Sequence, residues 1–127
     1  MTKQAINGVK GAPGAIGPYS QAIRVGDFLF CSGQIGLDPN TGNLAGDDVK
    51  IQAQRAMENI KAVLESQGLA FENVVKSTIF LTSMADFPLV NEVYGAYFPK
   101  EPPARSCVAV AALPKGAKVE IEVIAAF

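Results

Sequence analysis

The sequence contains no histidine among its 127 residues, and it contains only two cysteines. Without histidine, Ser-His and Cys-His nucleophile pairs, most zinc sites and imidazole acid-base catalysis are excluded. Proton transfer in any enzyme mechanism therefore falls to carboxylates, tyrosine, lysine or water. Cys31 and Cys107 both lie in strand-like apolar runs. They fit free thiols or a single disulfide, and such sparse use of cysteine favours the reducing cytoplasm.

An excess of charge of either sign is also lacking, since 11 basic and 12 acidic residues give a formal net charge of −1. Such a chain has no electrostatic footprint for nucleic acid or for an acidic membrane. No apolar run approaches the roughly 20 residues of a membrane span, and residues 1–4 do not lead into a signal-peptide core. The glycine spacings of phosphate-binding loops are missing, and no metal site is expected.

The composition is that of a folded domain, because 49% of the residues are hydrophobic and 18% are charged. A chain of this length buries roughly two-thirds of its unfolded surface. Residues 1–127 are therefore expected to form one domain. Residues 10–18, which are rich in glycine and proline, and residues 34–47 are expected to be loops; the second loop alternatively holds a small hairpin.

Hydrophobic periodicity and turn residues predict six strands and two helices. The expected strands cover residues 3–9, 19–25, 28–32, 74–82, 104–110 and 118–125, and the expected helices cover residues 48–67 and 86–98. Right-handed crossovers in the order β-β-β-α-β-α-β-β place both helices on the same face of one mixed sheet. We therefore predict an α/β (α+β) fold whose six-stranded sheet has one covered face and one open face.

Each expected helix has a capping residue and an apolar stripe. Asp47 or Asp48 can cap the first helix, which Gly68 ends, and Asp86 can cap the second, with Pro88 in its first turn. The stripe of the first helix comprises Val49, Ala53, Ala56, Met57, Ile60, Val63 and Leu64, and that of the second comprises Val90, Val93, Tyr94 and Tyr97. Both stripes are expected to pack in the core.

The strand that begins after Pro102 and Pro103 has two different faces. Alternation puts Arg105, Cys107 and Ala109 on the first face, and Ser106, Val108 and Val110 on the second. The second face is apolar enough to pack in the core. The first face carries a permanently charged guanidinium beside a thiol.

The last expected strand follows after a short turn at residues 113–116 and alternates in the same way. If the two strands form a hairpin with their apolar faces together, Arg105 and Cys107 lie on the same side of the sheet as Glu120 and Glu122. An exposed ion pair is one interpretation of this arrangement. Because Cys107 and Ile124 are unusual on a solvated face, we instead expect a second copy of the chain to cover it.

Four segments of the chain resemble the Rid (YjgF) family, and within it the RidA branch. These segments are residues 17–22 (GPYSQA), 32–34 (SGQ), 103–108 (PARSCV) and 113–122, where LP is followed by VEIE. They occur in the family's order, and the resemblance extends over the whole chain. It implies a chorismate-mutase-like subunit, a homotrimer with three clefts between subunits, and no cofactor. The implied reaction is hydrolysis of 2-imino acids, which pyridoxal-phosphate enzymes release, to 2-keto acids and ammonia.

The resemblance also implies roles for two charged residues. Arg105 would hold the substrate carboxylate in a bidentate pair, which fixes the position of the imine carbon. Glu120 would activate the attacking water and transfer its proton. Glu122 is a competing carboxylate on the same strand face, and Glu120 is preferred because it occupies the matching position of the family motif.

Five further residues are candidates for the cleft: Tyr19, Ser32, Gly33, Asn91 and Cys107. The first three match cleft positions of the family, whereas Asn91 is included because asparagine is unfavourable in the middle of a helix. Each has a plainer interpretation from the sequence alone. Tyr19 fits a half-buried strand position, Ser32 and Gly33 fit the end of a strand, and Asn91 fits a solvated helix position. Cys107 has no histidine to activate it, so it is expected to be a small packing residue whose backbone lines the cleft.

Two other functions fit the same residues. Relatives of the family have been described as ribonucleases or translation inhibitors, but the net charge of −1 and the lack of any basic run oppose nucleic-acid binding. Alternatively, the cleft around Arg105 captures small carboxylates without catalysis, as a sensor or a holdase. The second alternative needs Arg105 but not Glu120.

Overall fold

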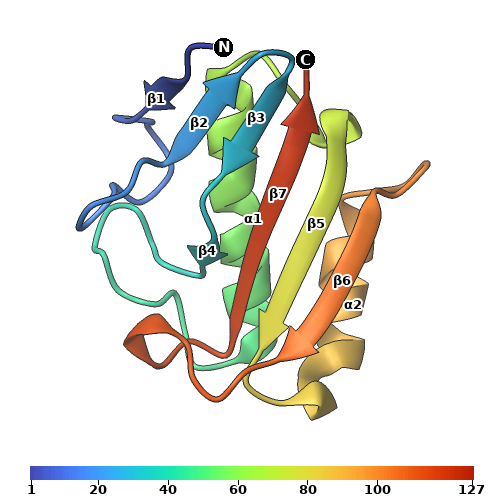
Figure 1. Ribbon diagram of the computed structural model, residues 1–127. Helices are drawn as coiled ribbons and strands as arrows, with labels where there is room; N and C mark the ends of the chain where they lie inside the picture. The colour runs from blue at the N-terminus through green and yellow to red at the C-terminus, as the bar shows by residue number, and fades with distance from the viewer.

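The sheet of the computed structural model, which describes residues 1–127, has seven strands (Figure 1). They are β1 Gln4–Ile6, β2 Ala22–Val25, β3 Phe28–Cys31, β4 Gln34–Ile35, β5 Val74–Leu81, β6 Ala104–Ala109 and β7 Val119–Ala126. The strand order is β1-β2-β3-β7-β5-β6, and β4 also pairs with β7. Only β5 and β6 are parallel, and the other pairs are antiparallel.

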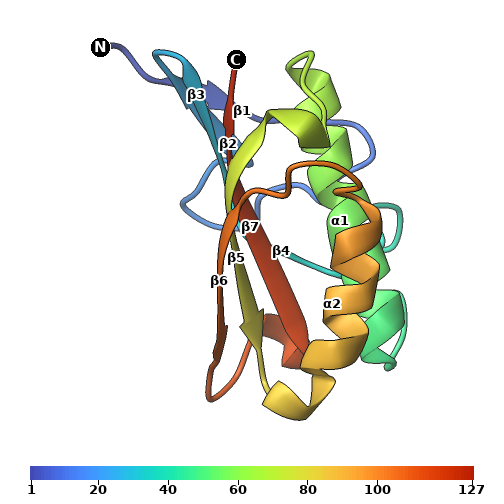
Figure 2. The same ribbon diagram turned by 90° about the vertical axis from the view of Figure 1, so that its right-hand side faces the viewer.

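Two helices, α1 Val49–Ser66 and α2 Phe87–Ala96, cover the same face of the sheet (Figure 2). Short 3₁₀ turns at Phe71–Asn73 (η1), Met84–Asp86 (η2) and Pro114–Gly116 (η3) connect the larger elements. The predicted α+β class and the placement of both helices on one face are confirmed. Neither helix combines the length and the apolar composition that crossing a membrane requires.

The first helix follows its sequence signals closely. The Asp48 carboxylate accepts the backbone N–H of Lys50 at 2.7 Å as an N-cap, and Gly68 has a φ of 73° just beyond the C-terminus. All seven residues of the predicted stripe are buried. The predicted stripe of α2 is also buried except for Tyr97, which is half-buried and donates its hydroxyl to Glu58 at 2.7 Å.

The six-stranded prediction was one strand short, because β4 consists of only two residues, Gln34 and Ile35. No periodicity can identify so short a strand. The loop that follows contains the bridge between Leu37 and Leu44 that the small-hairpin alternative requires. Two buried amides of α1 hold this loop: Gln52 donates to the Gly46 carbonyl at 2.8 Å, and Asn59 donates to the Leu37 carbonyl at 2.9 Å.

The predicted hairpin between the last two strands does not form. Strand β5 lies between them, parallel to β6 and antiparallel to β7. In this register Arg105 is paired with Ser77, and Ser77 is paired with Val123, which is buried. Paired residues share a face of the sheet, so Arg105 lies on the face that the helices cover. Arg105 and Cys107 therefore project toward the helices, whereas Glu120 and Glu122 project from the open face. The expectation that the four residues share a face was wrong.

The open face of the sheet is apolar over much of its area. Phe28, Phe30 and Val108 are 45%, 43% and 43% exposed, although these side chains are large and hydrophobic. Ile124 lies beside Phe30 on this face and is half-buried. Val108 was expected in the core, but β6 is an edge strand with its helix on the other side, so this prediction was wrong.

Gly36 is the position where the loop after β4 packs most tightly on α1. A Cβ atom at Gly36 would lie 2.5 Å from the backbone oxygen of Gln52 and 2.7 Å from its Cα. Because a helix backbone cannot move aside, we expect Gly36→Ala to destabilise the protein by roughly 2–3 kcal/mol. Denaturant unfolding measures this change. Gly95→Ala is the control, since a Cβ there meets nothing within 4 Å; equal stability of the two variants would contradict the packing argument.

Candidate functional site

A pocket of about 620 Å³ lies where the loop of residues 10–18 meets the β3–β4 connection and the open face of β7. Its lining comprises Pro13, Gly14, Ile16, Tyr19, Gln21, Ser32, Gly33, Gln34, Ile35, Leu37, Pro114, Lys115, Glu120 and Glu122. The pocket thus brings together four of the predicted site residues: Tyr19, Ser32, Gly33 and Glu120. Two carboxylates and one lysine are its charged groups.

The Glu120 side chain lies directly against the backbone of Gly33. A Cβ atom at Gly33 would be 2.6 Å from Glu120 Oε2 and 2.9 Å from its Cδ, so any larger residue at position 33 would displace the carboxyl group from this position. Burial raises the pKa of Glu120, and the negative charge of Glu122 raises it further. A carboxyl with a raised pKa can give and take a proton at a pH closer to neutrality.

The loop of residues 10–18 is held in place by Gln21, which is buried. The Gln21 side chain donates to the Pro13 carbonyl at 2.8 Å and accepts the backbone N–H of Val9 at 3.0 Å.

Ser32 and Tyr19, two of the predicted site residues, flank this loop and β2. Ser32 Oγ donates a short hydrogen bond to the Ser20 carbonyl. Tyr19 precedes β2 and is 52% exposed, so it does not occupy the strand position that its plainer interpretation required.

A second group of predicted residues lies outside this pocket, at the sheet edge under α2. Arg105 donates to Asn91 Oδ1 at 2.7 Å, and its guanidinium lies 5.3 Å from the ring centroid of Phe87 and 5.2 Å from that of Tyr94. Both rings are close enough for cation–π attraction. Arg105 forms no ion pair with any carboxylate of the chain, since the structure contains a single ion pair, Lys50–Glu92. Its remaining donors are exposed and free to bind an anion.

Both cysteines are free thiols, so the disulfide alternative is not realised. Cys31 is buried, and burial raises its pKa to about 12. Burial also raises the pKa of Cys107, while the neighbouring Arg105 charge acts in the opposite direction. Cys107 is half-buried against the core. An uncharged thiol in this position suits packing better than nucleophilic attack.

Several residues of the two groups have no functional role that the sequence predicts. Gln21 belongs to the GPYSQA segment without a function of its own, Tyr94 is predicted to be core, and Phe87 is in neither list. Lys115 was read as part of a turn; its φ of 57° is rare for a residue with a side chain, and its Nζ donates to the Gly42 carbonyl at 3.0 Å. Spacing alone could not have placed Arg105 over the two rings, because the helix and the strand meet only in the fold.

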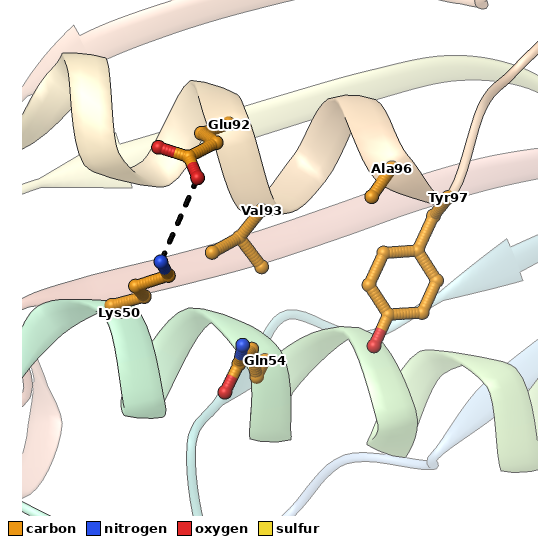
Figure 3. A pocket seen from close by; sticks show the side chains of 6 residues that line it. All are labelled: Lys50, Gln54, Glu92, Val93, Ala96 and Tyr97. Atoms are coloured by element: carbon orange, nitrogen blue, oxygen red, sulfur yellow. Dashed lines mark ion pairs between the residues drawn. The ribbon is translucent and has the colours of Figure 1, made fainter.

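Another hollow, of about 440 Å³, lies between α1 and α2 (Figure 3). The Lys50–Glu92 ion pair, at 3.6 Å, lies at one end of it, and Tyr97 lies at the other. Its two charges already neutralise each other, and it contains none of the predicted site residues. The pocket around Glu120 is therefore the better candidate for chemistry.

Comparison with known proteins identifies close relatives. The family model described as "Endoribonuclease L-PSP" matches residues 9–127. The protein DfrA of Myxococcus xanthus is 57% identical over 127 residues, covering 98% of this chain and 96% of that protein. The human 2-iminobutanoate/2-iminopropanoate deaminase is 49% identical over 114 residues, covering 90% and 83% of the two chains. The crystal structure of Escherichia coli TdcF with bound serine superposes with a TM-score of 0.92 at 44% identity, covering 98% and 99%.

These matches extend over almost the whole chain, and they agree with the four segments that resemble the family. They also agree with the two-helix, mostly antiparallel fold. The chain therefore belongs to the Rid (YjgF) family.

Proposed function

We propose that the protein is a 2-imino acid deaminase that hydrolyses reactive imines to 2-keto acids and ammonia, and that it works as a homotrimer with its sites between subunits. One observation carries the proposal. A single chain holds a guanidinium with no carboxylate partner and a partly buried carboxyl that lines a pocket, but it holds them on opposite faces of its sheet. A site that uses both groups needs a second copy of the chain.

The surface of the chain supports this assembly. Phe28, Phe30 and Val108 are exposed on the open face of the sheet, the same face from which Glu120 projects. Burial of such apolar area favours association. Arg105 lies on the exposed edge strand β6, where a neighbouring subunit can approach. A stable monomer in sedimentation equilibrium would contradict the assembly.

The chemistry follows from the two groups. Arg105 holds the imino acid carboxylate through two parallel hydrogen bonds, which fixes the C=N carbon near the pocket of a second copy. Glu120 takes a proton from water as the water oxygen bonds to that carbon, and the C=N electron pair moves to nitrogen, which receives that proton from Glu120. Glu120 then takes the proton of the new hydroxyl group and passes it to the amine as the C–N bond breaks, which releases ammonia and leaves the keto acid.

The remaining predicted residues are proposed to shape the substrate site. Tyr19, Ser32 and Gly33 line the same pocket as Glu120, and Asn91 and Cys107 lie with Arg105. Asn91 restrains the guanidinium by accepting one of its hydrogen bonds, at 2.7 Å. The relatives named as 2-iminobutanoate/2-iminopropanoate deaminases support the choice of substrate, although other relatives have other names.

Keto-acid formation from an imine generated in place tests the proposal. An amino-acid oxidase or a threonine dehydratase supplies the imines derived from alanine or 2-aminobutyrate, and the keto acid is measured with and without the protein. We expect faster keto-acid release than in buffer alone. A folded oligomer that gives no acceleration would refute the deaminase function.

Gly33→Ala is expected to lower this activity without unfolding the protein. The new Cβ would take the place of the Glu120 carboxyl group, which must then move away from the substrate position. A misplacement of about 1 Å can lower a rate by roughly 100-fold. Gly14→Ala is the matched control, because Gly14 lines the same pocket and a Cβ there meets nothing within 4 Å. Equal activity of the two variants would show that the position of Glu120 is unimportant.

A second candidate function is binding of small carboxylates without catalysis, and the TdcF structure with bound serine favours it. Under that function, Arg105→Ala abolishes serine binding measured by calorimetry, while Glu120→Gln leaves serine binding unchanged.

RNA cleavage, which the name of the family model suggests, is opposed by the net charge of −1. Salt-dependent RNA binding at physiological ionic strength would support it.

A further inference from the structure

Glu122 is a charged neighbour of Glu120 on the open face. The two residues are two positions apart on β7, so their side chains leave the sheet on the same side, and both line the same pocket. Both are half-buried. Across the sheet, Glu120 is paired with Phe80 and Glu122 with Thr78, neither of which carries a charge.

Two lysines face this pair from other elements, and neither forms an ion pair with it. Lys115, in η3, lines the pocket but donates its Nζ to the Gly42 carbonyl at 3.0 Å. Lys76, on β5, lies one row beyond Glu122 and donates its Nζ to Ser106 Oγ at 3.2 Å. In the chain, each carboxylate therefore has the other as a close charged neighbour without a direct counter-ion.

We propose that Glu122 tunes the proton affinity of Glu120 and so sets the pH range in which the pocket works. This inference rests on the proposed function for its catalytic consequence, but the interaction itself does not. A negative charge on Glu122 disfavours a second negative charge on Glu120 in a partly buried site. Glu122 is thus a tuning residue that acts through Glu120, and it is distinct from the group that activates water.

The sign of the effect is fixed by this geometry. When the charge of Glu122 is removed, ionisation of Glu120 becomes easier, so the pKa of Glu120 falls. The pH profile of kcat/KM should move to lower pH, whether Glu120 is required in its ionised or in its protonated form. In the proposed assembly, Arg105 of a second copy adds the same positive charge in the wild type and in the variant that lacks the Glu122 charge. The difference between their pH profiles therefore still reports the effect of Glu122.

Carbon-13 NMR titration of protein labelled at the glutamate carboxyl carbon tests the inference, with the Glu120 signal assigned from its loss in Glu120→Gln. We expect the Glu120 signal of Glu122→Gln to titrate at lower pH than in the wild type. Glu122→Asp, which keeps the charge, should remain closer to the wild type than Glu122→Gln. Glu92→Gln, which removes an exposed carboxylate on α2, should change nothing.

The activity profile of the same variants is measured in parallel. Glu122→Ala repeats the loss of charge with a smaller side chain, so the result does not depend on the folding of one variant. Identical titration of Glu120 in the wild type and in the charge-removing variants would overturn the inference. If the charge-removing variants show this titration shift but the wild type does not accelerate hydrolysis, the proposed function is refuted and the coupling of the two carboxylates still stands.

Discussion

Replacement of Arg105 by alanine is expected to lower kcat/KM for imine hydrolysis by roughly 30- to 5,000-fold. This range corresponds to about 2–5 kcal/mol, the usual effect of removing one partner from a buried charge pair joined by hydrogen bonds. The physical reason is that Arg105 has no carboxylate partner of its own. In the proposed mechanism its free donors therefore bind the substrate carboxylate. Keto-acid release from imines generated in place measures the effect.

Two variants make this prediction specific. Arg105→Lys keeps the charge but loses the planar fork, so its activity should lie between those of the wild type and of the alanine variant. Arg24→Ala removes another exposed arginine that lies over an aromatic ring, 3.8 Å from the centroid of Phe127. Arg24 is on β2, far from the edge strand β6 in the strand order of the sheet. Equal losses in Arg24→Ala and Arg105→Ala would point to a general effect of charge and contradict the role of Arg105.

Replacement of Glu120 by glutamine is expected to lower kcat by roughly 100- to 10,000-fold, the usual contribution of a general acid-base group. Binding of the keto acid product should be retained, because the variant leaves Arg105 intact. Calorimetry with pyruvate measures the binding, and keto-acid release measures the rate. Unchanged activity would remove Glu120 from the mechanism.

The same variant should not be less stable than the wild type at neutral pH. Burial, and then the charge of Glu122, raise the pKa of Glu120 in the folded protein. A raised carboxyl pKa means that folding is favoured below the unfolded pKa and that this contribution is lost as the pH rises through the folded pKa. Neutral glutamine avoids the ionisation. A clear fall in Tm for Glu120→Gln, with no fall for Glu92→Gln, would show that the carboxylate has a structural role.

Most of the elements could be predicted from the sequence, because their signals are local. The cap at Asp48, the glycine at Gly68 and the apolar stripe between them determine the first helix almost to the residue. Alternation likewise gave the correct two faces of β6 and β7. It could not give the neighbour of each strand, since consecutive strands are adjacent in only about two-thirds of cases.

The error in strand order changed the interpretation of the site. With β5 inserted between β6 and β7, Arg105 faces α2 and Glu120 faces the open side of the sheet. The family resemblance placed both in one list of site residues, but no local pattern could show that a single chain keeps them apart. The contact of Glu120 with Gly33 also depends on the tertiary fold, although the SGQ segment marked that position.

Subunit mixing tests most directly the claim that the site is formed between copies. Arg105→Ala and Glu120→Gln are unfolded together in equal amounts and refolded, and mixed oligomers are verified by mass spectrometry of isotopically distinct chains. We predict recovery of about a quarter of the wild-type activity, because each site then draws its two intact groups independently from different copies. Mixed oligomers that stay as inactive as the separate variants would show that the two groups do not act together across subunits, and would contradict the account.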